Sequence, residues 1–419
     1  MLTQKDLFAK ALLVEEPWFV DKIQFDQNAG KLEIWIDFER GSTFYYEDKE
    51  LGVKGQFKAY DTSQKTWRHL NFFQYQCYLH AWIPRIDIGQ GKVRQVQAPW
   101  EGHAAGFTLL FEALILELVK VMPVHQVGQL LSVYDKKLWN LIKAYTGIAR
   151  VCEDFSEVKV VGVDETSARK GHDYVTLFVD LVEKRTMFVA EGRGNEVIAD
   201  FVEDLVAHDG QADQIKQISC DMSPAFILGV EQNLTEADIV FDRFHVTKVI
   251  NDAVDKVRKA EVANNPILKN SKYLFLKNRD NLSEWQKQRL EDIQLSGLNL
   301  KTMKALMIRE AFQQIYQAPS IELFEKLLSK WYFWATHSRI EPIKEAAYTI
   351  RRHWNGVVNW IFYKISNGIL EGFNSIFQAA KAKARGYTRT DTIKAIIYLL
   401  TGKLDFGKIN PFYITHSKL

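Results

Sequence analysis

Two apolar strands that each end in an aspartate constrain this chain more than any other feature. Val158–Val163 is followed by Asp164, and Ile215–Cys220 is followed by Asp221. An aspartate at a strand end is, taken singly, most often a turn former or a helix cap. Acids at the carboxyl ends of adjacent strands are also the scaffold on which divalent metal ions are held for phosphodiester chemistry. Each aspartate alone is therefore open to a structural interpretation, whereas the pair points to a metal site.

The segments around these aspartates follow a definite order of elements. A meander of three strands, a helix, a strand, helical residues and a last strand is the order of a ribonuclease-H-like domain. Residues 245–365 then have an almost wholly helical pattern. The elements behind this interpretation are the strands Val158–Val163, Tyr174–Val182, Met187–Val189, Ile215–Cys220 and Ile239–Phe241, the last ending in Asp242, and a helix capped by Asn195.

A third acid lies on a predicted helix far along the chain. Glu371 follows Ser366-Asn367-Gly368, which is typical of a helix start. At 3.6 residues per turn, one face is apolar and is expected to pack on the sheet, while the opposite side binds metal and tracks a phosphate backbone. The apolar face comprises Phe373, Ile376, Phe377, Ala380 and Ala384, and the polar side comprises Glu371, Gln378 and Arg385 with Asn374 beside them. Taken alone, Glu371 is also explained as a first-turn glutamate favoured by the helix dipole.

The net charge of only +2 predicts neither nucleic acid nor membrane as a partner. Any DNA binding must therefore come from local patches. The C-terminal part of the Glu371 helix and the residues after it supply one such patch, with Lys381, Lys383, Arg385 and Arg389.

A second DNA-binding feature is predicted between Phe107 and Arg150. Three helices are expected here: one that ends at Pro123, a short one over Val124–Leu131, and a third over Lys136–Tyr145 with Asp135 as its N-cap. Three short helices with a tight turn before the last form a helix-turn-helix. An ordinary three-helix packing unit explains this stretch about as well. The residues expected to face DNA are Lys136, Lys137, Asn140 and Lys143.

Cysteines, apolar runs and the first residues exclude several classes of protein. The three cysteines lie far apart, which fits a reducing cytoplasm rather than a disulfide framework. The N-terminus, MLTQKDLFAK, lacks the apolar region of a signal peptide. The longest apolar stretch, Phe107–Met122, contains three charged side chains and is interpreted as a buried helix rather than a membrane span.

Ordered blocks of this sequence resemble those of the ISL-three family of bacterial insertion-sequence transposases. The catalytic blocks are GVDETSARKGHDYVTLFVD, ISCDMSPAF, FDRFHV and SNGILEGFNSIFQAAKAKARGYTR, and PRIDIGQGK, APW and GFTLLFEA are similar to the N-terminal part. The resemblance implies that Asp164, Asp221 and Glu371 are a D-D-E triad that holds two Mg²⁺ or Mn²⁺ ions. A metal-activated water would nick DNA at the ends of the element, and the freed 3′-hydroxyl would attack target DNA.

The same resemblance implies the partners and the location of the protein. The expected partners are double-stranded DNA, as terminal inverted repeats and as target, and a second copy of the chain on paired ends, in a dimer or a larger assembly. No membrane partner is expected, and the implied location is the bacterial cytoplasm, in association with the nucleoid.

The fold class expected is a multidomain α/β protein with five segments. They are a β-rich N-terminal domain (1–105), a helix-turn-helix (106–150), the first part of the ribonuclease-H-like core (155–260), a long helical insertion (261–350), and the second part of the core with the Glu helix and a basic tail (351–419).

The N-terminal segment departs from the family pattern, in which a zinc ribbon carries two cysteine pairs. The place of the first pair, near Tyr45–Gly52, has no cysteine, and the place of the second holds Ile88 and Gly91. Because zinc needs four nitrogen or sulfur ligands, no zinc is expected. The β-rich fold is instead expected to rest on aromatic packing from Trp67, Phe72, Phe73, Tyr78 and Trp82.

Several other residues invite a functional interpretation that we weigh against a structural one. Asp242 and His245 are possible auxiliary groups near the metals, although a structural role is favoured for both. The odd spacing of Cys77 and His80 puts them on opposite faces of a strand, which excludes a shared metal ion. Trp354 and Trp360 can stack on bases, but a buried helical face is the safer expectation.

Two rival functions remain open. One is a non-catalytic DNA-binding protein derived from a transposase, and the presence of all three acids argues against it. The other is a nuclease of the same fold that cleaves DNA without strand transfer.

Overall fold

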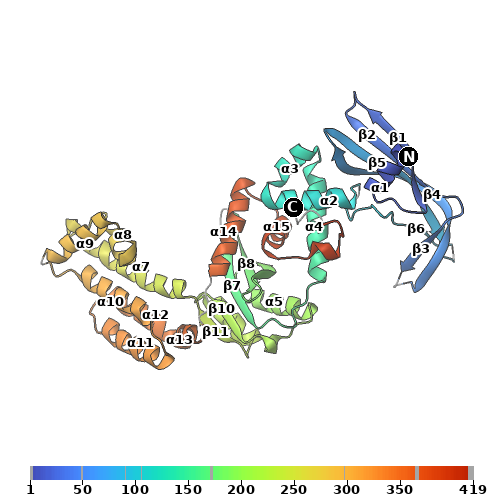
Figure 1. Cartoon of the computed structure of the whole chain (residues 1–419). Coiled ribbons are helices and arrows are strands. Elements are labelled where there is room, and N and C mark those ends of the chain that lie inside the picture. Colours follow the sequence, from blue (N-terminus) through green and yellow to red (C-terminus); the bar gives the residue numbers. More distant parts are fainter. Residues whose placement is uncertain are drawn as a thin grey trace. The chain divides into compact units, whose positions relative to one another are not determined.

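The computed structural model describes residues 3–48, 51–89, 91–104, 106–169, 173–296, 298–363 and 368–413. The chain forms two compact units (Figure 1). The flanking unit comprises Met1–Glu153 and Ala379–Leu419, and the central unit comprises Asp154–Gln378.

The flanking unit begins with helix α1 (Gln4–Ala11) and a six-stranded sheet. The strand order is β1-β2-β5-β4-β3, and β6 pairs with β5. Neighbouring strands are antiparallel except β2 and β5, which are parallel. The strands are β1 (Trp18–Asp26), β2 (Lys31–Phe38), β3 (Thr43–Asp48), β4 (Val53–Phe72), β5 (Tyr75–Asp87) and β6 (Val93–Gln95).

The core of this sheet is aromatic, but its members differ from those predicted. Trp67 is buried as expected, whereas Phe73 is 80% exposed and Trp82 is 47% exposed. The reason is register: alternate residues of β5 from Cys77 to Ile83 point inward, so Tyr78 and Trp82 lie on the other face. Phe72 and Phe73 lie where β4 turns into β5. The aromatic core is formed instead by Trp18, Phe44, Trp67 and Trp100, with the Trp18 and Trp100 ring centroids 5.2 Å apart.

Cys77 and His80 lie on opposite faces of β5, as their spacing predicts. Cys77 is buried in the core. The ring of His80 stacks on Trp35 with centroids 4.9 Å apart, and its Nδ1 lies 2.9 Å from the Thr66 hydroxyl. These contacts give both residues structural roles.

His69 is expected to make the flanking unit less stable in mildly acidic solution. Its Nδ1 lies 2.8 Å from the Thr108 hydroxyl, and burial, helped by the charge of Arg68, lowers the pKa of His69 to about 4. An unfolded histidine has a pKa of about 6.5, so the unfolded state binds more protons between these two pH values. The stabilisation is therefore complete above about pH 6.5 and falls by up to about 3 kcal/mol as the pH drops toward 4.

Urea unfolding at a series of pH values, in the wild type and in His69→Gln, measures this effect. The free energy of unfolding of the wild type should decrease more steeply below about pH 6.5 than that of the non-titrating variant. Parallel pH profiles in the two proteins would show that His69 does not carry the effect.

Three helices follow the sheet of the flanking unit: α2 (Leu109–Val121), α3 (Val124–Leu131) and α4 (Asp135–Val151). The three predicted helices are thus confirmed, although Asp135 is the first residue of α4 and not its cap. Tyr134 takes the cap position, and Asp135 instead accepts a hydrogen bond from His125 at 3.0 Å. In the centre of this bundle, the buried Glu112 carboxylate accepts hydrogen bonds from the backbone of Ala104 and from the Tyr145 hydroxyl.

The central unit has a five-stranded mixed sheet of order β11-β10-β7-β8-β9. β7, β8 and β9 form an antiparallel meander, and β10 and β11 are parallel to β7. The strands are β7 (Val160–Ser167), β8 (Tyr174–Asp180), β9 (Arg185–Glu191), β10 (Gln217–Cys220) and β11 (Asp238–Phe241), joined by α5 (Glu196–Ala207) and α6 (Pro224–Asn233). The predicted order of elements is confirmed, except that Asn195 occupies the cap position of α5 without a side-chain cap bond.

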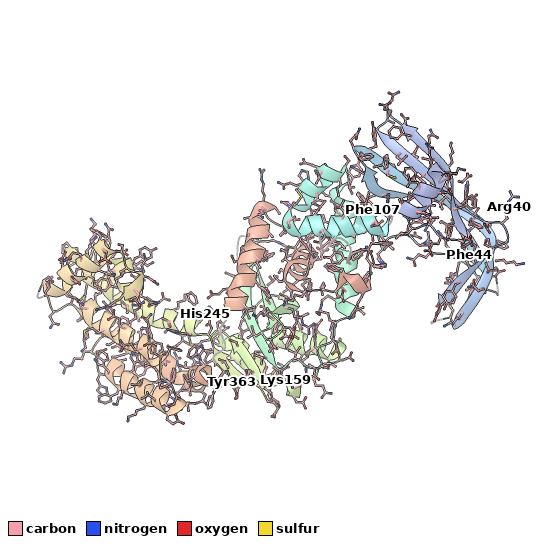
Figure 2. The ribbon with its side chains drawn as sticks, viewed as in Figure 1. Arg40, Phe44, Phe107, Lys159, His245 and Tyr363 are labelled. Carbon is pink, nitrogen blue, oxygen red and sulfur yellow. The ribbon has the colours of Figure 1, made fainter. Side chains whose placement is uncertain are left out.

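The rest of the central unit is helical, as predicted (Figure 1). One continuous core runs from the sheet into these helices. The edge strand β11 is covered, because α13, which ends at Tyr363 (Figure 2), packs along it. The Tyr363 hydroxyl donates to Asp238 at 2.6 Å, and Asn359 donates to the Ile239 carbonyl at 2.9 Å. The helices are α7 (Arg243–Val262), α8 (Lys272–Leu276), α9 (Glu284–Leu295), α10 (Lys301–Ile315), α11 (Ile321–Thr336), α12 (Glu341–Arg352) and α13 (Trp354–Tyr363).

Two further helices complete the described chain. α14 (Gly368–Lys383) passes from the central into the flanking unit, and α15 (Thr390–Thr401) packs on α4 within the flanking unit. The Ser366-Asn367 part of the predicted helix start lies outside the described residues. In the described part of the chain, the search for a helix long and apolar enough to cross a membrane found none.

Candidate active site

Three aspartates align across three adjacent strands of the central sheet. Asp164 lies inside β7, which continues to Ser167 and does not end at Asp164 as predicted, whereas Asp221 and Asp242 directly follow the ends of β10 and β11 as predicted. The parallel ladders pair Ser219 of β10 with Gly162 of β7, and Cys220 of β10 with Phe241 of β11. Continuing these registers past the end of β10 aligns Asp221 with Asp164 on one side and with Asp242 on the other. Parallel strands in register carry aligned side chains on the same face, so the carboxylates gather at one edge of the sheet.

The electrostatics of Asp164 are those of a crowded, half-buried carboxylate. Burial raises the pKa of Asp164, and the negative charges of Asp221 and Asp242 raise it further, while a hydrogen bond from the Glu165 backbone and the charge of His245 lower it. The Glu165 N–H donates to Oδ1 at 2.9 Å. Such a cluster keeps its charge only where positive charge balances it.

Asp242 caps the helix that carries His245. Its Oδ1 accepts from the Phe244 backbone at 3.1 Å, and its Oδ2 lies 3.8 Å from Nδ1 of His245 in the first turn of α7 (Figure 2). Nδ1 of His245 is buried and makes no hydrogen bond among the described residues. Asp242 thus has the structural contact that was favoured for it, and the pair also borders the acidic cluster.

A glycine allows α14 to approach the strand that carries Asp164. A β-carbon at Gly162 would lie 2.8 Å from Leu370 and 2.9 Å from Leu181, closer than packed carbon atoms come. Leu370 and Phe377 are buried on the side of α14 that faces the sheet. Because Gly162 has no side chain, α14 lies close enough to β7 for side-chain hydrogen bonds to the strand.

Two amides of α14 make those hydrogen bonds, which corrects the predicted orientation of the helix. Asn374 donates to Oδ2 of Asp164 at 2.7 Å, and Gln378 donates to the Thr166 hydroxyl at 2.9 Å. Ile376, expected on the sheet, is 45% exposed. The prediction placed only the apolar stripe of α14 against the sheet. A side-chain amide can also be buried there without a large penalty when it has a hydrogen-bond partner on the strand. DNA contacts by Asn374 and Gln378 stay a prediction.

Glu371 lies one turn before Asn374 and is exposed. It borders a hollow of about 650 Å³ that is also lined by Asp242, Arg243 and Arg309. Within the described ranges, no three histidine, cysteine, aspartate or glutamate side chains form a metal-binding group. The convergence of Asp164, Asp221 and Glu371 therefore stays a prediction.

The basic residues predicted to meet DNA lie in the flanking unit. On α4, Lys136, Lys137 and Asn140 are exposed, while Lys143 is half-buried and donates to Asp391 at 2.6 Å. Past the end of α14, Arg385 adopts a left-handed backbone and Arg389 is exposed. Lys381 is half-buried and Lys383 is exposed.

Asp391 is the residue of this surface that sequence reasoning missed. It accepts from Lys143 and, at 2.8 Å, from Arg389, and the hydrogen bond from Lys143 is the main reason why its pKa is lowered to about 2. The only feature of the sequence that singles out Asp391 is its place in the first turn of a helix. An acid is common at that place because it interacts favourably with the helix dipole, so the position alone does not indicate an ion pair.

Comparison with known families decides between the interpretations of these features. A family model described as "Transposase" matches residues 161–397, more than half of the 419-residue chain. A second model, the helix-turn-helix domain of transposase family ISL3, matches residues 96–146. The chain belongs to the ISL3 family of transposases. Its α2–α4 segment is accordingly a DNA-binding helix-turn-helix, and the resemblance found in the sequence is confirmed.

Named relatives of this transposase come from insertion sequences. The transposase of element IS1001 from Bordetella parapertussis is 27% identical over 79% of this chain and 82% of its own length. The transposase of element IS1557 from Mycobacterium tuberculosis is 24% identical over 94% of both chains. A solved intasome of simian T-cell lymphotropic virus is 13% identical, covers 43% of this chain and 73% of its own, and has a TM-score of 0.17, too low to carry an argument. The protein is a DNA transposase of an insertion sequence.

Proposed function

We propose that this transposase cleaves the ends of its element and joins them to target DNA at a two-metal site held by Asp164, Asp221 and Glu371. The observation that carries the proposal is the register of β7 and β10, which aligns the first two acids on one face of the sheet. Glu371 is taken as the third acid because its helix binds Asp164 one turn later, through Asn374.

The donor groups at this edge of the sheet fit a hard divalent cation. Oδ1 of Asn374 is buried and makes no hydrogen bond in the described part of the chain, although the other end of the same amide is bound to Asp164. A buried oxygen without a donor is costly, and Mg²⁺ or Mn²⁺ prefers amide and carboxylate oxygens. A bound divalent cation would also balance the mutual repulsion of the aspartates.

The roles of the residues follow from these contacts. When bound, two divalent ions activate an attacking oxygen and neutralise the leaving oxygen of the phosphodiester. Asp164, Asp221 and Glu371 would hold them, and Asn374 is a positioning residue that fixes the Asp164 carboxylate. Asp242 and His245 are proposed as auxiliary groups, because Oδ2 of Asp242 and Nδ1 of His245 border the cluster.

The proposed fold of the core is ribonuclease-H-like, with α7–α13 containing a helical insertion between the second aspartate and Glu371. This assignment is supported by the strand order: β7, β8 and β9 form an antiparallel meander, and β10 and β11 follow next to β7 and parallel to it. The N-terminal sheet is proposed to be a zinc-ribbon-like domain that folds without zinc, because tryptophan packing fills its core. The five predicted segments and a dimeric or larger assembly on paired DNA ends belong to the same proposal.

One assay separates strand transfer from its two alternatives. The wild type, Asp164→Asn and Asp200→Asn are each given labelled inverted-repeat ends and a supercoiled target with Mn²⁺. Asp200 is the control because it is an exposed acid on α5. Wild type and control should give joined products, and Asp164→Asn should give less than about a hundredth as much, because a neutral amide holds the cations poorly.

Other outcomes would contradict the proposal in different ways. Cleaved ends without joined products would identify a nuclease. Binding of the ends without any metal-dependent cleavage would identify a non-catalytic DNA-binding protein. Equal activity of Asp164→Asn and the control would remove Asp164 from the site.

A further inference from the structure

A second hollow, of about 520 Å³, lies beside α4, the last helix of the helix-turn-helix, and has no part in the proposed cleavage chemistry. Its floor and walls come from the start of α3, from α4, and from residues 384–392 with the start of α15, all within the flanking unit. Its volume is in the range of about 300–1,000 Å³ that is usual for pockets that hold small organic groups.

Ion pairs connect the segments that line the hollow. Asp391 binds Lys143 of α4 and Arg389 of the preceding segment, which ties the two walls together. On the opposite side, His125 of α3 lies 3.0 Å from Asp135 of α4. Gly386, with φ of +101°, turns the chain after α14 so that Tyr387 and Thr388 line the hollow.

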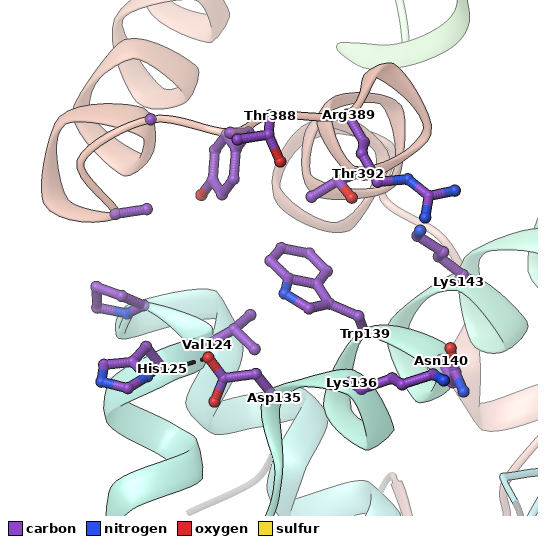
Figure 3. Close-up of a pocket in the computed structure, with 14 residues that line it drawn as sticks. Val124, His125, Asp135, Lys136, Trp139, Asn140, Lys143, Thr388, Arg389 and Thr392 are labelled. Atoms are coloured by element: carbon purple, nitrogen blue, oxygen red, sulfur yellow. Dashed lines mark hydrogen bonds and ion pairs between the residues drawn. The ribbon is translucent and has the colours of Figure 1, made fainter.

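An aromatic side chain occupies the middle of the hollow. Trp139 is half-buried, and Figure 3 shows its indole between α4 and the segment that carries Thr388 and Arg389. The Tyr387 ring meets it edge to face, with centroids 6.0 Å apart. An indole in an open hollow is a surface on which a flat group can stack.

Groups that recognise nucleic acid surround this indole. Lys136, Asn140 and Lys143 project from one face of α4, and Arg389 lies on the segment that faces this helix (Figure 3). The cations suit phosphate, and the asparagine and threonine side chains suit the polar edge of a base. Aromatic side chains ringed by cations form the usual site for an unstacked base.

We infer that the hollow between α4 and residues 384–392 binds one unstacked DNA base on the face of the Trp139 indole, beside Tyr387, while Lys136 and Arg389 bind the adjoining phosphates. The inference rests on the proposed function in one respect: it takes DNA to lie against the outer face of α4, where Lys136 and Asn140 are predicted to meet it, as part of the DNA that the transposase is proposed to cleave. It adds that the C-terminal segment reads DNA together with the helix-turn-helix, at a place where a base has left the duplex.

The test compares three short duplexes of one sequence in metal-free buffer, which prevents cleavage. One is fully paired, one has a single extrahelical 2-aminopurine, and one has an abasic extrahelical position. The wild type should bind the base-bearing bulge about tenfold more tightly than the abasic bulge, since stacking of one base contributes on that scale. The 2-aminopurine fluorescence should also be quenched on binding.

Substitutions of Trp139, compared with a control at another tryptophan, test where the base binds. Trp139→Ala should bind both bulges equally and leave the fluorescence unquenched, and Trp139→Phe should keep most of the preference. Trp285→Ala is the matched control, because Trp285 is 64% exposed and also has an arginine, Arg289, 5.2 Å from its ring. If Trp139→Ala does not fold by circular dichroism, Tyr387→Leu takes its place and should reduce both signals.

The outcomes for this inference and for the proposed function are distinct. Paired DNA bound with no preference between the two bulges would overturn the pocket and leave the transposase chemistry standing. A preference that survives in folded Trp139→Ala would also overturn it. Failure of the wild type to bind any of the three duplexes would instead contradict DNA binding at α4.

Discussion

Replacing Glu371 with glutamine is expected to reduce metal-dependent cleavage by a factor on the order of 10²–10³, with little change in DNA affinity. The glutamate is exposed and borders the hollow that Asp242 also lines. A hard cation needs the full charge of a carboxylate, and the isosteric amide removes that charge while it keeps the shape of the side chain. The decrease in cleavage is measured as the rate of DNA cleavage over a range of Mn²⁺ concentrations.

The competing explanation of Glu371 is that its negative charge only stabilises α14 by interacting with the positive end of the helix dipole. Glu284 is a suitable control, because it lies in the first turn of α9 and pairs on the surface with Lys287 at 2.7 Å. If the dipole alone matters, both substitutions should cost about 0.3–1 kcal/mol of stability and neither should affect cleavage. Full cleavage by Glu371→Gln would remove the third acid from the triad and leave the two aligned aspartates without a carboxylate from α14.

Local patterns were sufficient to predict the sheet of the central unit and its aspartates. The strands before Asp164 and Asp221 are apolar because both faces of the sheet are covered, and that pattern is visible in single segments. The parallel register of β7 and β10 brings two residues that are far apart in the chain to one edge. The strands that precede the acids are therefore visible in short segments, whereas the register that aligns the acids is a property of the folded sheet.

The orientation of α14 was not predictable in the same way. Its periodicity separates an apolar stripe from a polar one, but the face that packs is chosen by its partner: Gly162 leaves room for Leu370, and Asp164 and Thr166 bind the amides of Asn374 and Gln378. Such complementarity joins residues about two hundred positions apart and has no local signature. The aromatic core of the N-terminal sheet escaped prediction because a hairpin turn at Phe73 reverses the chain within one aromatic run.

Replacing Arg309 with methionine is expected to destabilise the helical part of the central unit by about 3–5 kcal/mol. Arg309 of α10 is 1% exposed, and its guanidinium donates to the side chain of Asn251 at 2.6 Å and to the carbonyls of Leu276 and Lys277 at 2.7 and 3.2 Å. Methionine fills much of the same volume but leaves these oxygens buried without donors. Thermal unfolding should show a midpoint lower by roughly 10 °C.

Arg279→Met is the matched control for Arg309→Met, because Arg279 is exposed and makes a surface ion pair with Glu310, the neighbour of Arg309, at 2.8 Å. Surface pairs of this kind contribute about 0–1 kcal/mol, so the control should unfold nearly as the wild type does. Equal unfolding of the two variants would mean that the buried guanidinium is not what holds α10 to α7. Since Arg309 and Glu371 line one hollow, cleavage by Arg309→Met is best measured well below its unfolding midpoint. A loss of activity there would reflect the shape of the wall that faces Glu371 and not the fraction of unfolded protein.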